Sequence, residues 1–177
     1  MAPSSSSLSM LFLMIMISSS SLPFFILVAG DEALIEKACK TTIYPDLCIS
    51  TIKSDGSSST ADTKGLVGIV IKKAEGIAAD ATAFIAKNLS AYGQAGELCE
   101  NHYVSAKQSL DESLKDLEAN QFNSAGMKSS EARESTKTCV SDFGRFGVAY
   151  PVELKQREEV FEHLCDIAST IIAKLLV

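Results

Sequence analysis

The stretch LCENHYVSAKQSLDESLKDLEANQFNSAGMKSSEARESTKTCV, residues 98–140, predicts two helices that fold back on each other. In its first half, apolar and small residues recur in steps of three and four, the spacing of a helix-bundle seam. The same steps recur in the second half and continue beyond it. We therefore expect helices over residues 94–118 and 121–143, with a turn at Ala119 and Asn120. The inward positions are Cys99, Tyr103, Ala106, Leu110, Ser113 and Leu117 on the first helix, and Phe122, Ala125, Ser129, Ala132, Thr136, Cys139 and Phe143 on the second.

The turn also lies midway between two cysteines, Cys99 and Cys139. Residues equidistant from the turn of an antiparallel helical hairpin face each other, so these cysteines are placed to form a disulfide. The second helix needs such a tie, because its seam consists mostly of small or weakly polar residues that bury little apolar area. We expect the disulfide to contribute about 2–4 kcal/mol to the free energy of unfolding.

Two further helices complete the predicted bundle. One begins at Asp62 and Thr63, which can cap it, and runs to about Leu89. The other begins at Pro151 or Val152, because a proline at the first helical position loses no hydrogen bond. No stretch alternates with period two for long enough to predict a strand. The predicted fold is therefore all-α, an antiparallel up-down-up-down four-helix bundle. The inward positions are Leu66, Ile69, Val70, Ile77, Ala81, Phe84, Ile85 and Leu89 on the former helix, and Val160, Leu164, Ile167, Ile171 and Leu175 on the latter.

A smaller helical hairpin is expected before the bundle. In the stretch ACKTTIYPDLCIS, a Tyr-Pro step lies between Cys39 and Cys48. The residue before a proline is biased out of the helical conformation, so the chain should fold at Tyr44. Short helices over 31–39 and 45–53 would then face each other, joined by a Cys39–Cys48 disulfide. The expected linkers are residues 54–62, before the bundle, and residues 141–150, between its last two helices.

The beginning of the chain is expected to be a secretory signal peptide. Residues 1–30 carry no charged side chain, and they end in small residues at 28–30, where a signal peptidase could cut. A retained membrane anchor is the alternative, but serines and Pro23 interrupt the roughly twenty apolar residues that a span requires. The mature domain would then be residues 31–177, free of the membrane. In an oxidising compartment four of the five cysteines can pair, which leaves Cys165 as a buried free thiol.

The overall charge favours a protein partner over a nucleic acid. The net charge is −6, and the sequence contains no basic cluster. An acidic chain of this kind is a poor candidate for binding nucleic acid, whose phosphates require lysine and arginine. Complementary charge speeds association, so a basic protein partner fits better.

The sequence offers no pattern that indicates catalysis. His102 and His163 are the two histidines. His163 and Cys165 are two residues apart on a helix and point to different faces. Glu159 and His163 are four apart and could share a metal, but metal sites in bundles draw ligands from several facing helices. We therefore expect no catalytic residue, no metal and no cofactor.

Five segments together resemble the plant invertase and pectin methylesterase inhibitor family. They are CKTTIYPDLC, ADTKGL, LCENHYVSAKQSLDESL, TCVSDF and HLCDIASTIIAKLL, spread over residues 33–176. The resemblance implies a secreted inhibitor without chemistry of its own, which forms a one-to-one complex with a carbohydrate-active enzyme. It also implies the two disulfides named above, and a helical hairpin before a four-helix bundle.

The resemblance leaves two target enzymes open. Invertase inhibitors of the family carry a Pro-Lys-Phe motif in the turn before the third helix, which reaches into the invertase active site. Here the equivalent residues are Asn120, Gln121 and Phe122, of which only the last matches. The missing lysine removes a cation that could meet the catalytic carboxylates of a glycosidase. We therefore expect pectin methylesterase as the target and acid invertase as the alternative.

The turn Asn120-Gln121-Phe122 is the predicted target-binding segment. Phe122 also begins the seam of its helix, so it is equally favoured that its ring fills the end of the hydrophobic core. Because position 120 lies just before a helix, we expect it to accommodate proline.

Three further expectations concern modification, location and a remote alternative function. Asn88-Leu89-Ser90 is a sequon for N-glycosylation. The expected location is the apoplast or cell wall, with the vacuole as the alternative. A secreted carrier of a small apolar ligand is the remote alternative, and it would require an internal cavity of several hundred Å³.

Overall fold

The computed structural model describes residues 32–176 of the chain. The prediction of a signal peptide over residues 1–30 lies outside these described residues. Helices joined by short links make up the described part, and it contains no strand. None of the helices in this part is long and apolar enough to cross a membrane.

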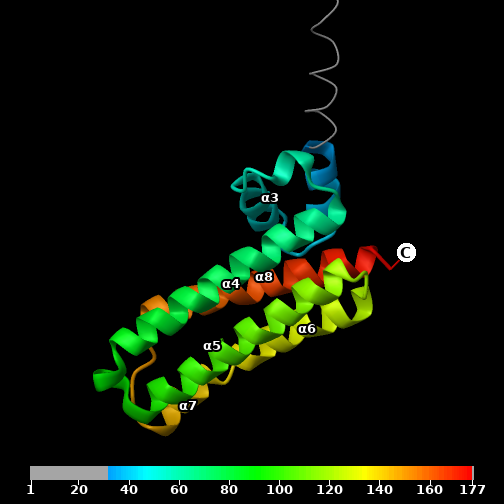
Figure 1. Cartoon of the computed structure of the whole chain (residues 1–177). Coiled ribbons are helices and arrows are strands. Elements are labelled where there is room, and N and C mark those ends of the chain that lie inside the picture. The colour runs from blue at the N-terminus through cyan, green and yellow to red at the C-terminus, as the bar shows by residue number, and fades with distance from the viewer. Residues whose placement is uncertain (1–31, 177) are drawn as a thin grey trace, which may run out of the picture.

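Four long helices form a bundle (Figure 1). They are α4 (Thr63–Lys87), α5 (Leu89–Glu118), α6 (Phe122–Thr136) and α8 (Val152–Lys174). Both α4 and α6 pack against α5 and α8, so α4 and α6 lie diagonally opposite each other. Successive helices run in opposite directions, as Figure 1 shows. The prediction of an all-α helical bundle is confirmed.

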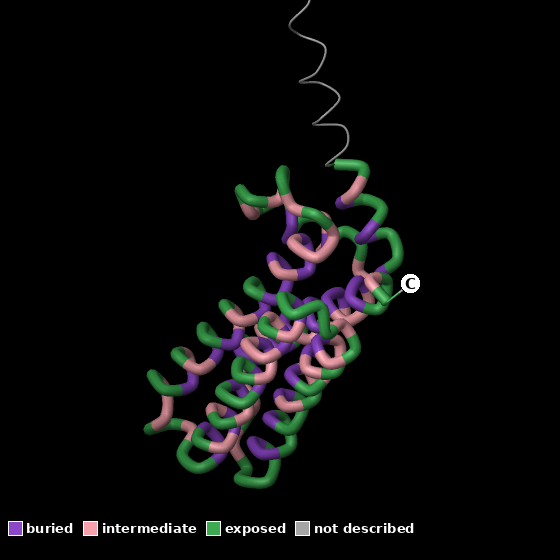
Figure 2. Tube along the Cα trace, turned by 45° about the vertical axis from the view of Figure 1, so that its right-hand side comes forward, coloured by how far each residue is buried: buried purple, intermediate pink, exposed green. Residues whose placement is uncertain are grey.

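The interior is built from the predicted face of α5. All six of its seam residues, from Cys99 to Leu117, are buried, and Figure 2 shows the buried positions recurring along the inner side of each helix. On α8 the prediction is wrong at Val160, which is 36% exposed, whereas Phe161 is fully buried. The Phe161 ring meets the ring of Tyr103 edge-on at 6.0 Å. The larger aromatic side chain therefore takes the inward position.

The helix predicted over residues 121–143 is divided in two. After α6 ends, Lys137 and Thr138 form a turn, and α7 (Cys139–Arg145) follows. The hydroxyl of Thr136 donates to the carbonyl of Arg133 at 3.1 Å, and the hydroxyl of Thr138 donates to the carbonyl three residues before it at 3.3 Å. Such local bonds compete with the backbone hydrogen bonds of a helix. The linker predicted over 141–150 consequently begins only after α7.

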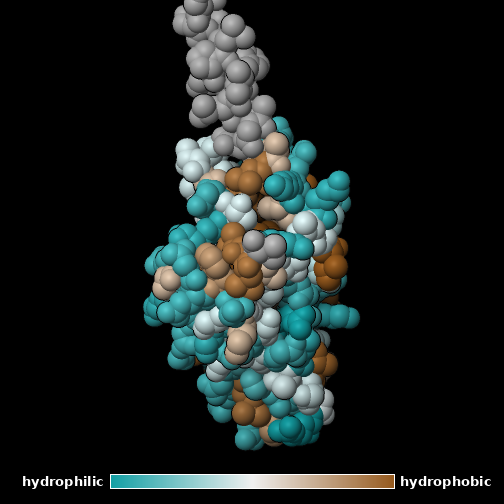
Figure 3. Space-filling model, turned by 90° about the vertical axis from the view of Figure 1, so that its right-hand side faces the viewer, coloured by the Kyte–Doolittle hydropathy of each residue, from teal (hydrophilic) through white to brown (hydrophobic). Residues whose placement is uncertain are grey.

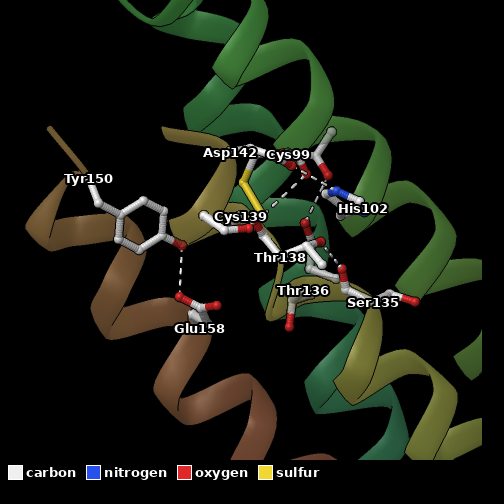
Figure 4. Close-up of a disulfide and its surroundings, with 12 residues drawn as sticks. Cys99, His102, Ser135, Thr136, Thr138, Cys139, Asp142, Tyr150 and Glu158 are labelled. Atoms are coloured by element: carbon white, nitrogen blue, oxygen red, sulfur yellow. Dashed lines mark hydrogen bonds and ion pairs between the residues drawn. A yellow bond between two sulfur atoms is a disulfide. The ribbon is translucent and has the colours of Figure 1, made fainter. Parts of the chain in front are cut away.

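The segment α6–α7 is tied to α5 by a disulfide and by buried serines. The disulfide joins Cys99 to Cys139, the pair expected from the turn position, with Cα atoms 4.8 Å apart (Figure 4). Further along the interface, the Ser113 hydroxyl donates to the carbonyl of Ala125 at 2.8 Å and lies 2.9 Å from the Ser129 hydroxyl. The apolar burial of α6 is weak, and these buried hydrogen bonds stabilise its packing on α5 in addition to the disulfide, the one tie that the sequence predicts.

A helical hairpin stands at the end of the bundle where α4 begins (Figure 1). It consists of a helix over residues 32–39 and of α3 (Pro45–Lys53). A disulfide joins Cys39 to Cys48, both fully buried, and this is again the pair that the sequence predicts. Tyr44 lies just outside α3 as its N-cap, at the fold expected before the proline.

The hairpin rests on the bundle through an aromatic contact. The ring of Tyr44 stacks on the ring of His163 in α8, with centroids 3.7 Å apart. The linker between hairpin and bundle contains one short 3-10 turn, η1 (Ser58–Thr60). The Asp62 carboxylate then caps α4 by accepting the backbone N–H of Gly65 at 2.8 Å, as its place in the sequence predicts.

The link between α4 and α5 is a single residue, Asn88. Helix α4 ends at Lys87, two residues before the predicted end. Inside α5, Gly93 has φ 50° and ψ −136°, so residues 89–92 form a separate helical turn. Glycine tolerates such a conformation because it lacks a Cβ atom. The straight part of α5 begins at Gln94, the residue where the sequence places the helix start.

Candidate functional site

The turn between α5 and α6 closes with hydrogen bonds typical of helix C-termini. Asn120 has φ 58°, in the left-handed region. Its backbone N–H donates to the carbonyl of Leu117 at 3.1 Å, and the N–H of Gln121 donates to the carbonyl of Asp116 at 2.8 Å. These are the two bonds of a Schellman motif, whose left-handed residue is usually glycine and sometimes asparagine. The backbone of the candidate segment is therefore fixed by the end of α5.

Proline is incompatible with this turn at position 120. A proline ring holds φ near −65° and removes the backbone N–H, whereas Asn120 has φ 58° and donates a hydrogen bond. The expectation that proline would be accommodated is wrong, because position 120 terminates α5 and is not the first residue of α6. A Pro-Lys-Phe motif at this place requires a different backbone.

A cation nevertheless lies beside the turn. The ammonium group of Lys64, in the first turn of α4, donates to the side-chain oxygen of Asn120 at 3.1 Å. Gln121 itself is exposed and uncharged. Lys64 could not be predicted as part of this site, since it lies 56 residues before Asn120 and no local pattern links the two. The turn therefore has a positive group supplied by α4, although residue 121 supplies none.

Phe122 belongs both to the core and to the surface. Its side chain is half-buried and packs against the hydrophobic core. The rest of the ring lines an open groove on the outside of the bundle. Phe122 therefore contributes to the end of the core, and its role in target binding stays a prediction.

The groove extends from Phe122 along α6 and α8 and has a volume of about 940 Å³. Met127 is 64% exposed and Leu176 is 50% exposed, so apolar side chains face solvent here. Viewed from the end of the bundle that carries this turn, apolar surface gathers in patches within a mostly hydrophilic face (Figure 3). The groove is open to solvent and is not an internal cavity of the kind that a small-ligand carrier requires. Its lining further includes Ser109, Asn123, Gly126, Ser130, Glu131, Glu134, Ser135, Ser169, Ile172 and Ala173.

Ion pairs hold the charged side chains around the groove. Lys128 lies 2.9 Å from Glu112 and 3.0 Å from Glu131, and Lys137 lies 2.8 Å from Glu134. The hydrogen bond from Lys128 lowers the pKa of Glu112, and the hydrogen bond from Lys137 lowers the pKa of Glu134. These carboxylates therefore stay ionised in weakly acidic solution, and the groove keeps a charged polar rim around its apolar floor.

Both histidines make structural contacts away from this face. The Nε2 atom of His102 lies 3.0 Å from the buried carboxylate of Asp142, which connects α5 to α7 next to the disulfide (Figure 4). His163 stacks on Tyr44, as described above. In α8, burial raises the pKa of the Cys165 thiol, which is free and fully buried. Over residues 32–176, no three His, Cys, Asp or Glu side chains are grouped so that they could hold a metal ion.

Comparison with known proteins connects this architecture to a family of inhibitors. The family model described as plant invertase/pectin methylesterase inhibitor matches residues 33–171. An Arabidopsis thaliana protein named cell wall / vacuolar inhibitor of fructosidase 2 is 35% identical over 155 residues, which are 84% of this chain and 86% of that protein. An Oryza sativa subsp. japonica protein named pectinesterase inhibitor 28 is 32% identical over 157 residues, which are 81% of this chain and 69% of that protein.

The fold is shared with a solved inhibitor structure. A crystal structure of a mutant form of a pectin methylesterase inhibitor from Arabidopsis superposes with a TM-score of 0.66, covering 78% of this chain and 95% of that one. At 19% sequence identity, this likeness concerns the fold alone. The matched relatives carry the names of inhibitors and not of enzymes. The chain therefore belongs to the plant invertase/pectin methylesterase inhibitor family.

Proposed function

We propose that this protein inhibits a pectin methylesterase by covering its substrate cleft in a non-covalent one-to-one complex. The observation that carries the choice of target is the backbone of Asn120. Its φ of 58° and its hydrogen bond to Leu117 exclude proline, and with it the Pro-Lys-Phe turn that invertase inhibitors of the family present. The rice relative named pectinesterase inhibitor 28 supports the same target.

The candidate binding face combines the α5–α6 turn with the groove along α6 and α8. Three apolar side chains, Phe122, Met127 and Leu176, lie partly or largely exposed along it. Partly exposed aromatic and methionine side chains within a polar rim are typical of protein interfaces. A stable complex buries about 800 Å² on each partner, so the enzyme would cover more than the turn alone. With no activated nucleophile on this face, occlusion is the mechanism that its chemistry supports.

Inhibition of an acid invertase is the second candidate function. The relative named cell wall / vacuolar inhibitor of fructosidase 2, at 35% identity, supports it. So does the ammonium group of Lys64, which lies beside Asn120 and could meet a carboxylate in a glycosidase active site. Identities of 35% and 32% do not separate the two targets.

An assay against both enzyme classes tests the proposal. Purified protein is added to a panel of pectin methylesterases and a panel of acid invertases, each at acidic and neutral pH. We expect a pectin methylesterase to lose activity without covalent modification and without consumption of the inhibitor. Full activity of every pectin methylesterase, together with inhibition of an invertase, would replace the first candidate by the second.

We also propose that residues 1–30 direct the chain into the secretory pathway and are then removed, which leaves residues 31–177 as the mature domain. A relative named as a cell wall / vacuolar inhibitor supports an extracellular or vacuolar location. We place the protein in the cell wall, where pectin is found. Sequencing of the N-terminus of protein recovered from the cell wall tests both parts of this proposal.

A further inference from the structure

The sequon Asn88-Leu89-Ser90 lies at a sharp turn of the bundle. Asn88 is the single residue that links α4 to α5, and its carbonyl accepts the N–H groups of Ala91 and Tyr92 at 2.9 and 3.1 Å. The Asn88 side chain is half-exposed and Ser90 is exposed. Glycosylated sequons lie at the surface because the attached sugar is bulky and hydrophilic. The position therefore meets the steric requirement for a glycan on the folded protein.

The amide group of Asn88 has one hydrogen bond within the protein. Its Nδ2 atom donates to the carbonyl of Phe84 at 2.7 Å, which satisfies an unpaired group at the end of α4. An asparagine amide carries two N–H groups, and attachment of a sugar replaces one of them. The other N–H remains available for Phe84. A glycan on Asn88 is therefore compatible with the hydrogen bond that closes α4.

Asn88 lies at the end of the bundle opposite the candidate binding face. In Figure 1 the α4–α5 link is at the lower left, whereas the α5–α6 turn is at the upper right, beside the C-terminal end of α8. Residues around the link contact the beginning of α8 and α7: the guanidinium of Arg157 lies 4.9 Å from the centre of the Phe84 ring, and the rings of Tyr92 and Phe143 are 5.2 Å apart. A glycan at this end would leave the turn and the groove uncovered.

We infer that Asn88 is an N-glycosylation site whose glycan covers the end of the bundle remote from the target. The inference rests on the proposed entry into the secretory pathway. The donor is an oligosaccharide linked through pyrophosphate to a polyprenol lipid. The Asn88 amide nitrogen gives a proton to a base of the transferring enzyme and forms a bond to the anomeric carbon of the sugar, while the bond from that carbon to the oxygen of the lipid pyrophosphate breaks. The pyrophosphate leaves with the bonding electron pair.

The transfer takes place on the nascent chain. In the folded protein the Asn88 amide is hydrogen-bonded to Phe84, and its carbonyl belongs to the next helical turn. An enzyme that modifies the amide therefore meets it most readily before α4 and α5 have packed together. The retained N–H can then close α4 when the modified chain folds.

Two substitutions at Ser90 separate the glycan from the hydrogen bond. Ser90→Ala destroys the sequon but keeps Asn88 and its bond to Phe84, and Ser90→Thr keeps the sequon. The full chain, including residues 1–30, is produced in plant cells, and protein is recovered separately from the cells and from their medium. Its mass is measured before and after a peptide N-glycosidase that acts on plant glycans. Release in ¹⁸O water converts a glycosylated asparagine into labelled aspartate, which identifies the residue.

We expect the label at Asn88 in wild type and in Ser90→Thr, and no glycan in Ser90→Ala. Inhibition of the target enzyme should change less than twofold when the glycan is removed. Secreted wild type with an unmodified Asn88 would overturn the site while leaving the proposed secretion intact. Unmodified protein retained in the cells would overturn both. A rise in inhibition of tenfold on glycan removal would contradict the placement of the glycan away from the target. Glycosylated protein that inhibits no enzyme would support the site and refute the proposed function separately.

Discussion

Replacement of Asn120 by proline should destabilise the protein strongly, because the turn between α5 and α6 depends on a left-handed residue with a free N–H. Asn120 has φ 58° and donates to Leu117 at 3.1 Å. A proline where the backbone cannot accept it costs about 3 kcal/mol. The bond from Gln121 to Asp116, at 2.8 Å, requires the same turn, and its loss adds about 1 kcal/mol. We expect a total loss of roughly 4 kcal/mol from the free energy of unfolding.

Thermal and urea unfolding of Asn120→Pro and wild type measure this loss. For a domain of this size, 1 kcal/mol lowers the Tm by about 2–4 °C, so the Tm should fall by roughly 8–16 °C. Asn120→Gly is the matched control, since glycine adopts positive φ readily, and its Tm should stay within about 4 °C of wild type. An Asn120→Pro variant that melts together with wild type would refute the left-handed turn. It would also restore the possibility of an invertase-type motif at this position.

Four further substitutions and one pH series extend the test. Phe122→Ala should cost about 1–3 kcal/mol, less than a fully buried phenylalanine, and should also weaken inhibition; an effect on neither would show that the ring has no role in core or interface. Cys139→Ser and Cys48→Ser each remove one disulfide, and Cys139→Ser should lower the free energy of unfolding by about 1.3 kcal/mol more in a chain-entropy account. The reason is that the two bridges span 40 and 9 residues. Equal losses in the two variants would contradict that ordering. Burial, followed by the neighbouring carboxylate of Asp111, raises the pKa of Glu75 to about 7. A carboxyl group whose pKa is raised in the folded protein stabilises the fold at pH values below its ordinary pKa. This contribution is lost as the pH rises through the pKa of the folded protein. The Tm should therefore fall between pH 5 and pH 8. Glu75→Gln should flatten that fall, and an unchanged slope would remove Glu75 as its cause.

The regular parts of the fold follow from short-range patterns in the sequence. The seam of α5 repeats in steps of three and four over six positions, and every one of them is buried. The cysteine pairs could be assigned because each brackets a single turn, at Tyr44 and at Ala119-Asn120. Both signals depend only on spacing along the chain, which a sequence displays directly.

The structure differs from the sequence prediction where two local conformations or two inward positions lie close in energy. At Thr136 and Thr138, side-chain hydrogen bonds to nearby carbonyls compete with the helix and separate α6 from α7. On α8 the inward position passes from Val160 to Phe161, one residue along the helix. Both residues are apolar and both lie at helical spacing from Leu164, and in the structure it is Phe161 that packs against Tyr103 on another helix. Such choices depend on tertiary contacts that periodicity does not encode.

The candidate face was predicted only in part. The sequence indicated the turn residues Asn120, Gln121 and Phe122 through a resemblance to the family. The expectation that the backbone at Asn120 accommodates proline was wrong. Lys64 reaches the turn from the beginning of α4, and the groove forms between α6 and α8, far apart in the sequence. A signal for the turn was nevertheless present, because asparagine directly after a helix is a frequent left-handed terminator.

A titration of pectin methylesterase activity tests the central claim most directly. Wild type is compared with Met127→Arg, in the groove, and with Val140→Arg, a matched change at another exposed apolar residue, on α7; the two side chains are 64% and 49% exposed. The account predicts that wild type and Val140→Arg abolish activity at one equivalent of inhibitor, in competition with pectin, while Met127→Arg inhibits at least tenfold more weakly. Met127→Arg inhibiting as well as wild type, or an enzyme fully active in excess wild type, would contradict it.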